Sequence, residues 1–301
     1  MAKQAALRIL QLSLSNQFDK IDLNNAFEQL APHYLAAWFY HRHRLKTDDS
    51  RWHTEYTRQS LQNTLIIREL ESLESVLPTI RLKGTSFFPW LYRDIGERHL
   101  TDADLLVSPD NLPIAIDILT ERGYKLVNQI KWDANFHRVS LTRESTEKFL
   151  YQVDLHTQLH WEQSSDLSMK THKVGQYDSL TKPVLFYHLC MNWAFQDTFI
   201  GLNKLLDIHL LWNSLTEQEQ AETEKIFFDS NYEKVWDWCM RALAVLKGEK
   251  DKMLSEAFLS NPKRYPMKYF GLKHLNKKNL GQALKYDLLW LGSYLKNSEK
   301  P

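Results

Sequence analysis

Two aspartates separated by one residue are the clearest chemical signal in the sequence. They lie in residues 101–107, TDADLLV, whose apolar second half predicts a strand. Successive side chains of a strand point to opposite faces, so Asp102 and Asp104 would share one face and repel each other unless a cation lies between them. Carboxylates of this kind suit Mg²⁺, which binds one or two of them together with substrate phosphates.

A glycine-containing turn precedes this pair. Residues 79–82 predict a short strand that ends at Lys83, Gly84, Thr85 and Ser86. A strand that turns through a glycine into a helix directs backbone N–H groups at an anion, so we expect a helix from Thr85 or Ser86 and a phosphate site at its start. Two alternatives stay open: Gly84 could simply end the strand, and the Lys83 side chain could simply extend to solvent.

One face of a later predicted strand is polar. Residues 135–142 and 148–161 alternate like the two strands of a hairpin, which places Asp154, His156 and His160 on one face. Unpaired polar groups on a central strand are costly, so this face needs a function. A shared zinc ion is disfavoured, because residues four apart on a strand are separated by ~13 Å. We expect His156 to line a nucleotide or metal pocket.

Further charged residues have two interpretations each. Arg98, four residues before Asp102, could neutralise a triphosphate or form a structural ion pair with the neighbouring carboxylates. Lys204 and Asp207 are spaced to pair on one face of a helix, which is the structural interpretation that we favour.

The order of these motifs resembles the bacterial family of uncharacterised nucleotidyltransferases, within the polymerase-β-like superfamily. That family has an L-K-G turn, an L-Y pair, an arginine, a D-x-D-L-L-V strand, a helix that ends in G-Y and a later D-L-H strand. The resemblance covers residues ~78–165 and, more loosely, the helical segment to ~215. The matching residues here are Leu82-Lys83-Gly84, Leu91-Tyr92, Arg98, Asp102 to Val107, Gly123-Tyr124 and Val153-Asp154-Leu155-His156.

The resemblance implies transfer of a nucleoside monophosphate from an NTP, with two Mg²⁺ or Mn²⁺ ions. It implies that Asp102 and Asp104 hold both ions, and that Asp154 holds the ion nearer the acceptor and helps to deprotonate its hydroxyl. Residues 84–86 would hold the β- and γ-phosphates. The acceptor (a small molecule, a protein or an RNA end), the base of the NTP and the oligomeric state stay open. The alternative is a catalytically silent nucleotide- or partner-binding protein with the same fold.

Composition narrows the class of protein. Lys and Arg number 38 against 37 Asp and Glu, so no overall positive charge argues for nucleic acid, and the basic and aromatic residues at 41–46 favour a solvated loop. Cys190 and Cys239 lie in apolar helical patterns without metal-ligand spacing, which favours buried thiols in a reducing cytoplasm. The N-terminus lacks the features of a signal peptide, and no run approaches the ~18 apolar residues of a membrane span.

The periodicity predicts an α+β protein with three parts. A small mixed β-sheet core of the nucleotidyltransferase type at 77–165 is expected between an N-terminal helical region at 1–76 and a C-terminal helical region at 166–301. Residues 164–180 predict a loop. The helices expected from apolar spacing and capping residues cover about 51–73, 184–195, 202–212, 232–246, 252–259 and 282–295, with caps at Asp22, at residues 48–50 and at Thr216 with Glu219.

Overall fold

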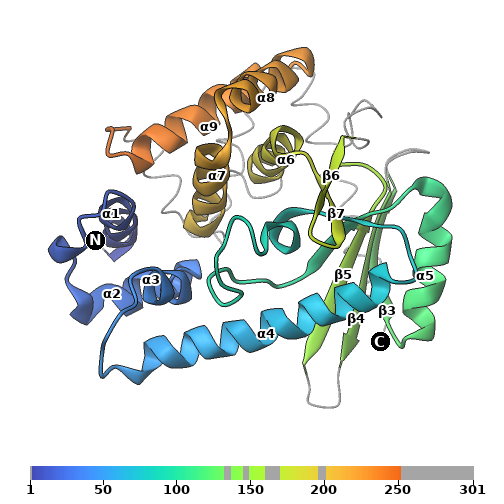
Figure 1. Ribbon diagram of the computed structural model, residues 1–301, viewed down its shortest axis with the longest axis horizontal. Coiled ribbons are helices and arrows are strands. Elements are labelled where there is room, and N and C mark those ends of the chain that lie inside the picture. Colours follow the sequence, from blue (N-terminus) through green and yellow to red (C-terminus); the bar gives the residue numbers. More distant parts are fainter. Residues whose placement is uncertain (1, 132–136, 145–148, 160–169, 196–200, 252–301) are drawn as a thin grey trace.

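The computed structural model describes residues 2–131, 137–144, 149–159, 170–195 and 201–251, and these residues form an α+β fold. A seven-stranded mixed sheet lies beside two groups of helices, one from each end of the chain (Figure 1). The predicted fold class is therefore confirmed. No helix within these described ranges is long and apolar enough to span a membrane.

The sheet brings strands from distant parts of the chain together, in the order β3-β4-β5-β2-β1-β7-β6. Strand β2 is parallel to β5 and β1 is parallel to β7, whereas the other neighbours are antiparallel. The strands are β1 (Ile80–Arg81), β2 (Ala103–Leu106), β3 (Lys125–Lys131), β4 (His137–Glu144), β5 (Leu150–His156), β6 (Thr171–Val174) and β7 (Tyr177–Leu180).

Three helices begin at the capping residues that the sequence predicts. Asp22 and Asp49 accept backbone N–H groups at the starts of α2 and α4, and Thr216 and Glu219 form the expected capping box of α8. These three caps are confirmed. The helices are α1 (Ala2–Leu14), α2 (Leu23–Leu30), α3 (Ala36–Arg42), α4 (Ser50–Glu74), α5 (Leu112–Glu121), α6 (Lys182–Phe195), α7 (Leu202–Ser214), α8 (Glu217–Asp229) and α9 (Glu233–Leu246).

Helix α4 is tied to one face of the sheet by two ion pairs. Its Glu74 binds Arg81 of β1 through two hydrogen bonds of 2.6 and 2.7 Å, and its Glu69 accepts one of 2.8 Å from Arg143 of β4. Strand side chains alternate, so this face also carries Leu105, the neighbour of Arg81 in the register, and not Asp104. The Asp104 side chain therefore points to the opposite face.

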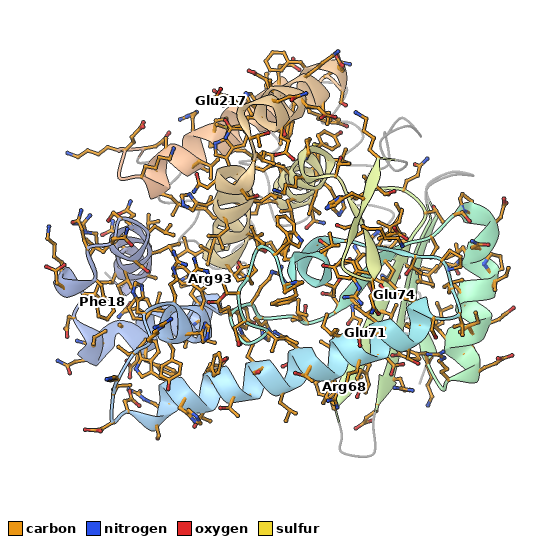
Figure 2. All side chains as sticks on the ribbon, viewed as in Figure 1. Phe18, Arg68, Glu71, Glu74, Arg93 and Glu217 are labelled. Atoms are coloured by element: carbon orange, nitrogen blue, oxygen red, sulfur yellow. The ribbon has the colours of Figure 1, made fainter. Side chains whose placement is uncertain are left out.

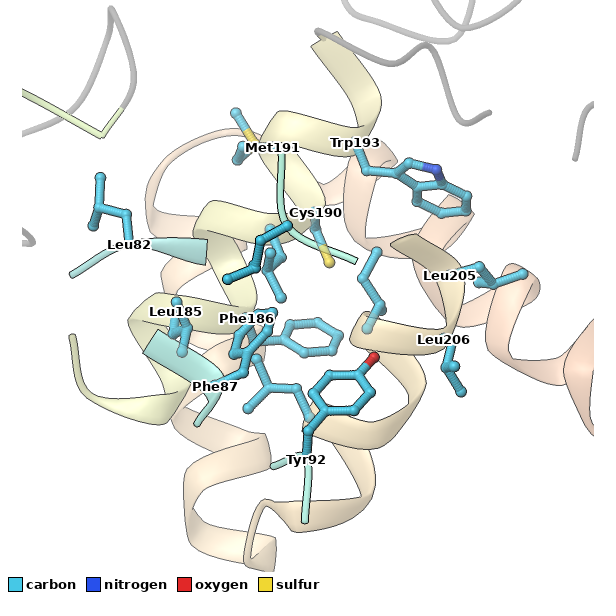
Figure 3. Packing of buried hydrophobic residues seen from close by; sticks show 14 of the residues in the cluster. Leu82, Phe87, Tyr92, Leu185, Phe186, Cys190, Met191, Trp193, Leu205 and Leu206 are labelled. Carbon is cyan, nitrogen blue, oxygen red and sulfur yellow. The ribbon is translucent and has the colours of Figure 1, made fainter. Parts of the chain in front are cut away.

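Helix α6 is buried all round and forms the centre of the C-terminal helices. Every residue from Pro183 to Phe195 is buried, as expected for a helix that is apolar on all sides. Its side chains pack with Leu82, Phe87 and Tyr92 of the segment after β1 and with residues of α7 (Figure 3). The two cysteines, Cys190 and Cys239, are buried free thiols, as predicted.

Two predictions about secondary structure are wrong. Residues 171–180 form the β6–β7 hairpin, not a loop, because β7 gains a parallel partner in β1 that local polarity cannot reveal. The helix expected after Gly84 is only a 3₁₀ turn, Lys83–Phe87. The predicted core boundary at 165 precedes two strands of the same sheet, and the helices predicted at 252–259 and 282–295 lie outside the described residues.

Candidate functional site

Strand pairing brings two aspartates and a histidine together on one face of the sheet. Asp104 of β2 lies directly opposite Asp154 of β5 in the parallel register, and His156 follows two residues later on the same face. One ligand atom from each of these residues lies within 4.8 Å of the other two. Asp104 is 4% exposed and Asp154 is completely buried, so their charges need partners within the protein.

Asp104 receives two donors on the same oxygen. Lys83 Nζ lies 2.7 Å and His156 Nε2 lies 3.0 Å from Asp104 Oδ1. Burial alone would raise the pKa of Asp104, but the Lys83 ammonium and the His156 N–H hold this pKa well below its usual range. Burial lowers the pKa of His156, and Nε2 must carry a proton to donate to the Asp104 carboxylate.

Asp154 is held by residues that the sequence did not point to. Arg138 of β4 forms a short ion pair with Asp154 Oδ2, and Gln152 Nε2 donates to Oδ1 at 3.3 Å. Strands β4 and β5 are antiparallel with Arg138 opposite His156, which puts the arginine on the carboxylate face. The sequence predicts these two strands without their register, and the register is what places Arg138 near Asp154.

Asp102 lies beside this cluster and just before β2. Its Oδ1 accepts a hydrogen bond of 3.0 Å from Thr101 Oγ1. Burial and the negative charges of Asp104 and Asp154 raise the pKa of Asp102 to about 6, against the opposing effect of Lys83. Asp102 thus interacts with the charges of Asp104 and Asp154. It does not belong to the group of three residues whose ligand atoms lie within 4.8 Å of one another.

The turn from Lys83 to Phe87 is buried and partly satisfied by its own backbone. Thr85 Oγ1 donates to the Leu82 carbonyl at 3.0 Å, and Ser86 Oγ donates to the Lys83 carbonyl at 2.6 Å. A Cβ atom on Gly84 would lie 1.9 Å from Nη1 of Arg98 and 2.6 Å from Cδ2 of Leu100. The glycine is therefore required at least for the close approach of Arg98.

Arg98 forms a structural ion pair, but with a different carboxylate from the one considered. Its Nε and Nη2 lie 3.0 and 2.8 Å from Oδ1 and Oδ2 of Asp207 in α7, and Tyr92 donates its hydroxyl to the same Oδ1 at 2.5 Å. The sequence interpretation of a pair with Asp102 or Asp104 is corrected in this respect. Asp207 was expected to face Lys204, and helix spacing could not reveal these two partners.

The family of the chain follows from a comparison with known proteins. A family model described as "Uncharacterised nucleotidyltransferase" matches residues 19–229, more than half of the chain. The chain belongs to this nucleotidyltransferase family. The matched part spans every described strand and helices α2 to α8. No curated protein and no solved structure matches the chain significantly.

The donor set of this nucleotidyltransferase fits a divalent cation. Asp104 and Asp154 offer hard carboxylate oxygens, which Mg²⁺ and Mn²⁺ prefer. A ring nitrogen of His156 is within reach as well, but Nε2 could bind a metal ion only after it gives up its proton and its hydrogen bond to Asp104. The site is also strongly charged on both sides, because Lys83 and Arg138 contact the same two carboxylates.

The nucleotidyltransferase also contains a cavity of about 500 Å³ away from these carboxylates. Its walls come from α4, the segment 88–95 and the β6–β7 turn, and they include Glu71, Glu74 and Arg93 (Figure 2). Arg81, which lies on the opposite face from Asp104, also lines it. This cavity therefore does not contain the aspartate cluster.

Proposed function

We propose that this nucleotidyltransferase moves a nucleoside monophosphate from an NTP to a hydroxyl acceptor, with the help of Mg²⁺ or Mn²⁺. The observation that carries the proposal is the meeting of Asp104, Asp154 and His156 in a buried site of a chain from this family. We also propose that the fold belongs to the polymerase-β-like superfamily. Two buried free thiols suit a reducing compartment, and we infer that the protein works in the cytoplasm.

The three aspartates have distinct proposed roles. Asp102, Asp104 and Asp154 would hold the divalent cations, which when bound polarise the α-phosphoryl group and neutralise the charge that develops on it. The acceptor oxygen forms a bond to the α-phosphorus, the bond to the β-phosphate oxygen breaks, and pyrophosphate leaves. Asp154 would help to take the proton that the acceptor hydroxyl loses. His156 holds the Asp104 carboxylate through its 3.0 Å hydrogen bond.

The turn after β1 is the proposed place of the leaving phosphates. Lys83 Nζ already lies 2.7 Å from Asp104, so its positive charge is next to the reacting centre. We propose that Gly84, Thr85 and Ser86 contact the β- and γ-phosphates. The hydroxyls of Thr85 and Ser86 now donate to backbone carbonyls, and each would donate to a phosphate oxygen in place of that carbonyl. Arg98 packs closely against Gly84 and so helps to hold this turn in place.

One observation favours a second candidate, a catalytically silent nucleotide- or partner-binding protein. Both buried aspartates are already paired with side-chain cations of the chain, Lys83 and Arg138. A site of this kind is neutral without any ligand. Wild-type turnover separates the two candidates, because only the enzyme incorporates the nucleotide into an acceptor.

The test is transfer of label from each α-labelled NTP to acceptors in a cell extract. Asp104→Asn retains the size of the side chain and removes the charge, so we expect incorporation to fall by about a hundredfold or more, since metal-bound charge stabilisation amounts to several kcal/mol. The matched control is Asp110→Asn, an exposed aspartate outside the site, which should retain wild-type transfer. Equal incorporation by wild type and Asp104→Asn would refute the site.

A further inference from the structure

Two cations of the chain pair with Asp104 and Asp154 at the carboxylate face. Asp104 and Asp154 are neighbours on adjacent strands, and two like charges at this distance repel strongly in a buried site. Lys83 contacts the first and Arg138 the second, so that two cations match two anions. The fold can therefore hold this face together without a metal ion.

The same contacts oppose the binding of a metal ion. The ligand atoms of Asp104, Asp154 and His156 lie within 4.8 Å of one another, and Lys83 Nζ is 2.7 Å from one of the Asp104 oxygens. A divalent cation held by these ligands would have two fixed positive charges as near neighbours, which is strongly unfavourable where water is excluded. The two side chains must move away for the cation to bind well.

We propose that Lys83 and Arg138 are exchangeable counter-ions, which hold Asp104 and Asp154 in the metal-free protein and transfer to the nucleotide phosphates when a divalent cation occupies the carboxylates. The part of this inference that concerns nucleotide rests on the proposed function. Metal and nucleotide then bind cooperatively, because the metal releases the two cations that the phosphates need.

The chemistry of the two side chains suits this exchange. Lys83 has a flexible aliphatic chain with a compact charge at its end. Its side chain is 12% exposed to solvent, so the ammonium group can move away from Asp104. Arg138 carries a planar group of donors that fits two phosphate oxygens as well as it fits a carboxylate. The Arg138 side chain is 18% exposed although its partner Asp154 is fully buried. The guanidinium can therefore move from Asp154 towards solvent.

Arg143 is a matched comparison for Arg138 on the same strand. It too pairs with a carboxylate, Glu69 of α4 at 2.8 Å, but it lies five positions along the strand from Arg138, so its side chain points to the opposite face of β4. Its partner, Glu69, lies on a helix and also accepts the Tyr124 hydroxyl at 3.0 Å, and it is not one of the three residues whose ligand atoms meet. Arg143 should therefore have no effect on metal binding.

The first experiment measures Mn²⁺ binding to the full chain by calorimetry in the absence of nucleotide. Lys83→Met and Arg138→Met each remove one competing charge, and we expect each variant to bind Mn²⁺ roughly tenfold more tightly than wild type. Arg143→Met should bind as wild type does, and Lys83→Arg should show no gain because it retains the charge. With Mn²⁺ present, a non-hydrolysable ATP analogue should bind Lys83→Met and Arg138→Met roughly tenfold more weakly.

A second experiment needs only the wild-type protein, in case a variant does not fold. Acylation of lysines by an amine-reactive ester, resolved by peptide mass spectrometry, reports whether Lys83 has left Asp104. We expect Mn²⁺ to increase labelling of Lys83 several-fold and the ATP analogue with Mn²⁺ to suppress it again. Lys173, which pairs with Asp178 on the edge hairpin, should be labelled equally in all three samples.

The outcomes separate this inference from the proposed transfer reaction, because neither measurement requires turnover. Variants that bind Mn²⁺ no more tightly than wild type, or Lys83 labelling that does not respond while Mn²⁺ binds, would overturn the exchange even if transfer is active. Failure of wild type and both variants to bind Mn²⁺ would overturn it as well. Tighter Mn²⁺ binding without any transfer activity would retain the exchange and refute the enzyme.

Discussion

Two buried ionic clusters in this protein resemble each other but differ in the number of carboxylates that they contain. At the carboxylate face, Asp104 and Asp154 lie side by side. Lys83 and His156 contact Asp104, and Arg138 contacts Asp154. Between the segment after β1 and helix α7, the single carboxylate of Asp207 binds Arg98 through both oxygens and also accepts the Tyr92 hydroxyl. Both clusters lie close to the turn that begins at Lys83.

The difference indicates which cluster is structural. One carboxylate with a forked arginine and a tyrosine is satisfied and has no charge to offer a ligand. The carboxylate face instead holds two adjacent carboxylates, each paired with one cation of the chain, and Asp102 adds a third negative charge nearby. Several carboxylates close together are what a divalent cation binds, so we propose that the carboxylate face binds the ligand and that the Arg98–Asp207–Tyr92 cluster supports the fold.

The largest effect is expected from Arg98→Met, which breaks the structural cluster. The variant leaves the Asp207 carboxylate buried and without its main partner, which costs roughly 3–5 kcal/mol of unfolding free energy. Urea denaturation measures this loss. Arg98→Lys should recover little of it, because lysine cannot form the two-pronged contact. Full recovery by Arg98→Lys, or rescue of Arg98→Met by Mn²⁺ and ATP, would place Arg98 in the binding site instead.

A smaller effect is expected from Gly84→Ala, which acts on the structural cluster from the other side. The new Cβ would overlap Arg98 and Leu100, so the arginine must shift from Asp207 or the turn must move. We expect a loss of roughly 2–3 kcal/mol, in the range of an overpacked core site. Thermal unfolding without ligands is the measurement. Unchanged stability combined with weaker binding of the ATP analogue would show that Gly84 serves the phosphates and not the packing.

The smallest effect is expected from Asp102→Asn, which tests whether Asp102 is crowded by the other aspartates of the carboxylate face. The folded-state pKa of Asp102 is raised to about 6, above the ordinary value of 3.8, so between about pH 4 and 6 the folded protein binds more protons at this residue than the unfolded chain does. Ionised Asp102 therefore destabilises the fold: the effect is complete above about pH 6 and disappears as the pH falls towards 4. Asp102→Asn should gain roughly 1–2 kcal/mol at pH 7.5 and nothing at pH 4.

Denaturation of Asp102→Asn and wild type at several pH values checks this slope. Asp110→Asn is the control, because its side chain is exposed and the difference from wild type should be flat. A stability difference between Asp102→Asn and wild type that does not change with pH would mean that Asp102 is not crowded by the other two aspartates. Saturating Mn²⁺ should reduce the stability difference between Asp102→Asn and wild type, since a bound cation screens the repulsion between the aspartates.

Local chemistry was predictable because it depends on neighbouring residues. Capping side chains such as Asp22, Asp49 and Thr216 bond to N–H groups two or three positions away, so their types and spacing specify the starts of the helices. The alternation of residues along β2 and β5 likewise determines that Asp104 shares a face with Asp102, and Asp154 with His156, whatever the rest of the chain does.

The partners of these residues depended on the tertiary structure. Arg138 meets Asp154 through the register of two antiparallel strands, Asp207 meets Arg98 across 109 positions of sequence, and β7 becomes a strand because β1 lies beside it. Each contact is decided by how whole elements pack, and no periodicity of a single segment contains that information. The sequence determined which side chains can carry charge to one face, and the packing of distant elements decided which of those charges meet and which are neutralised.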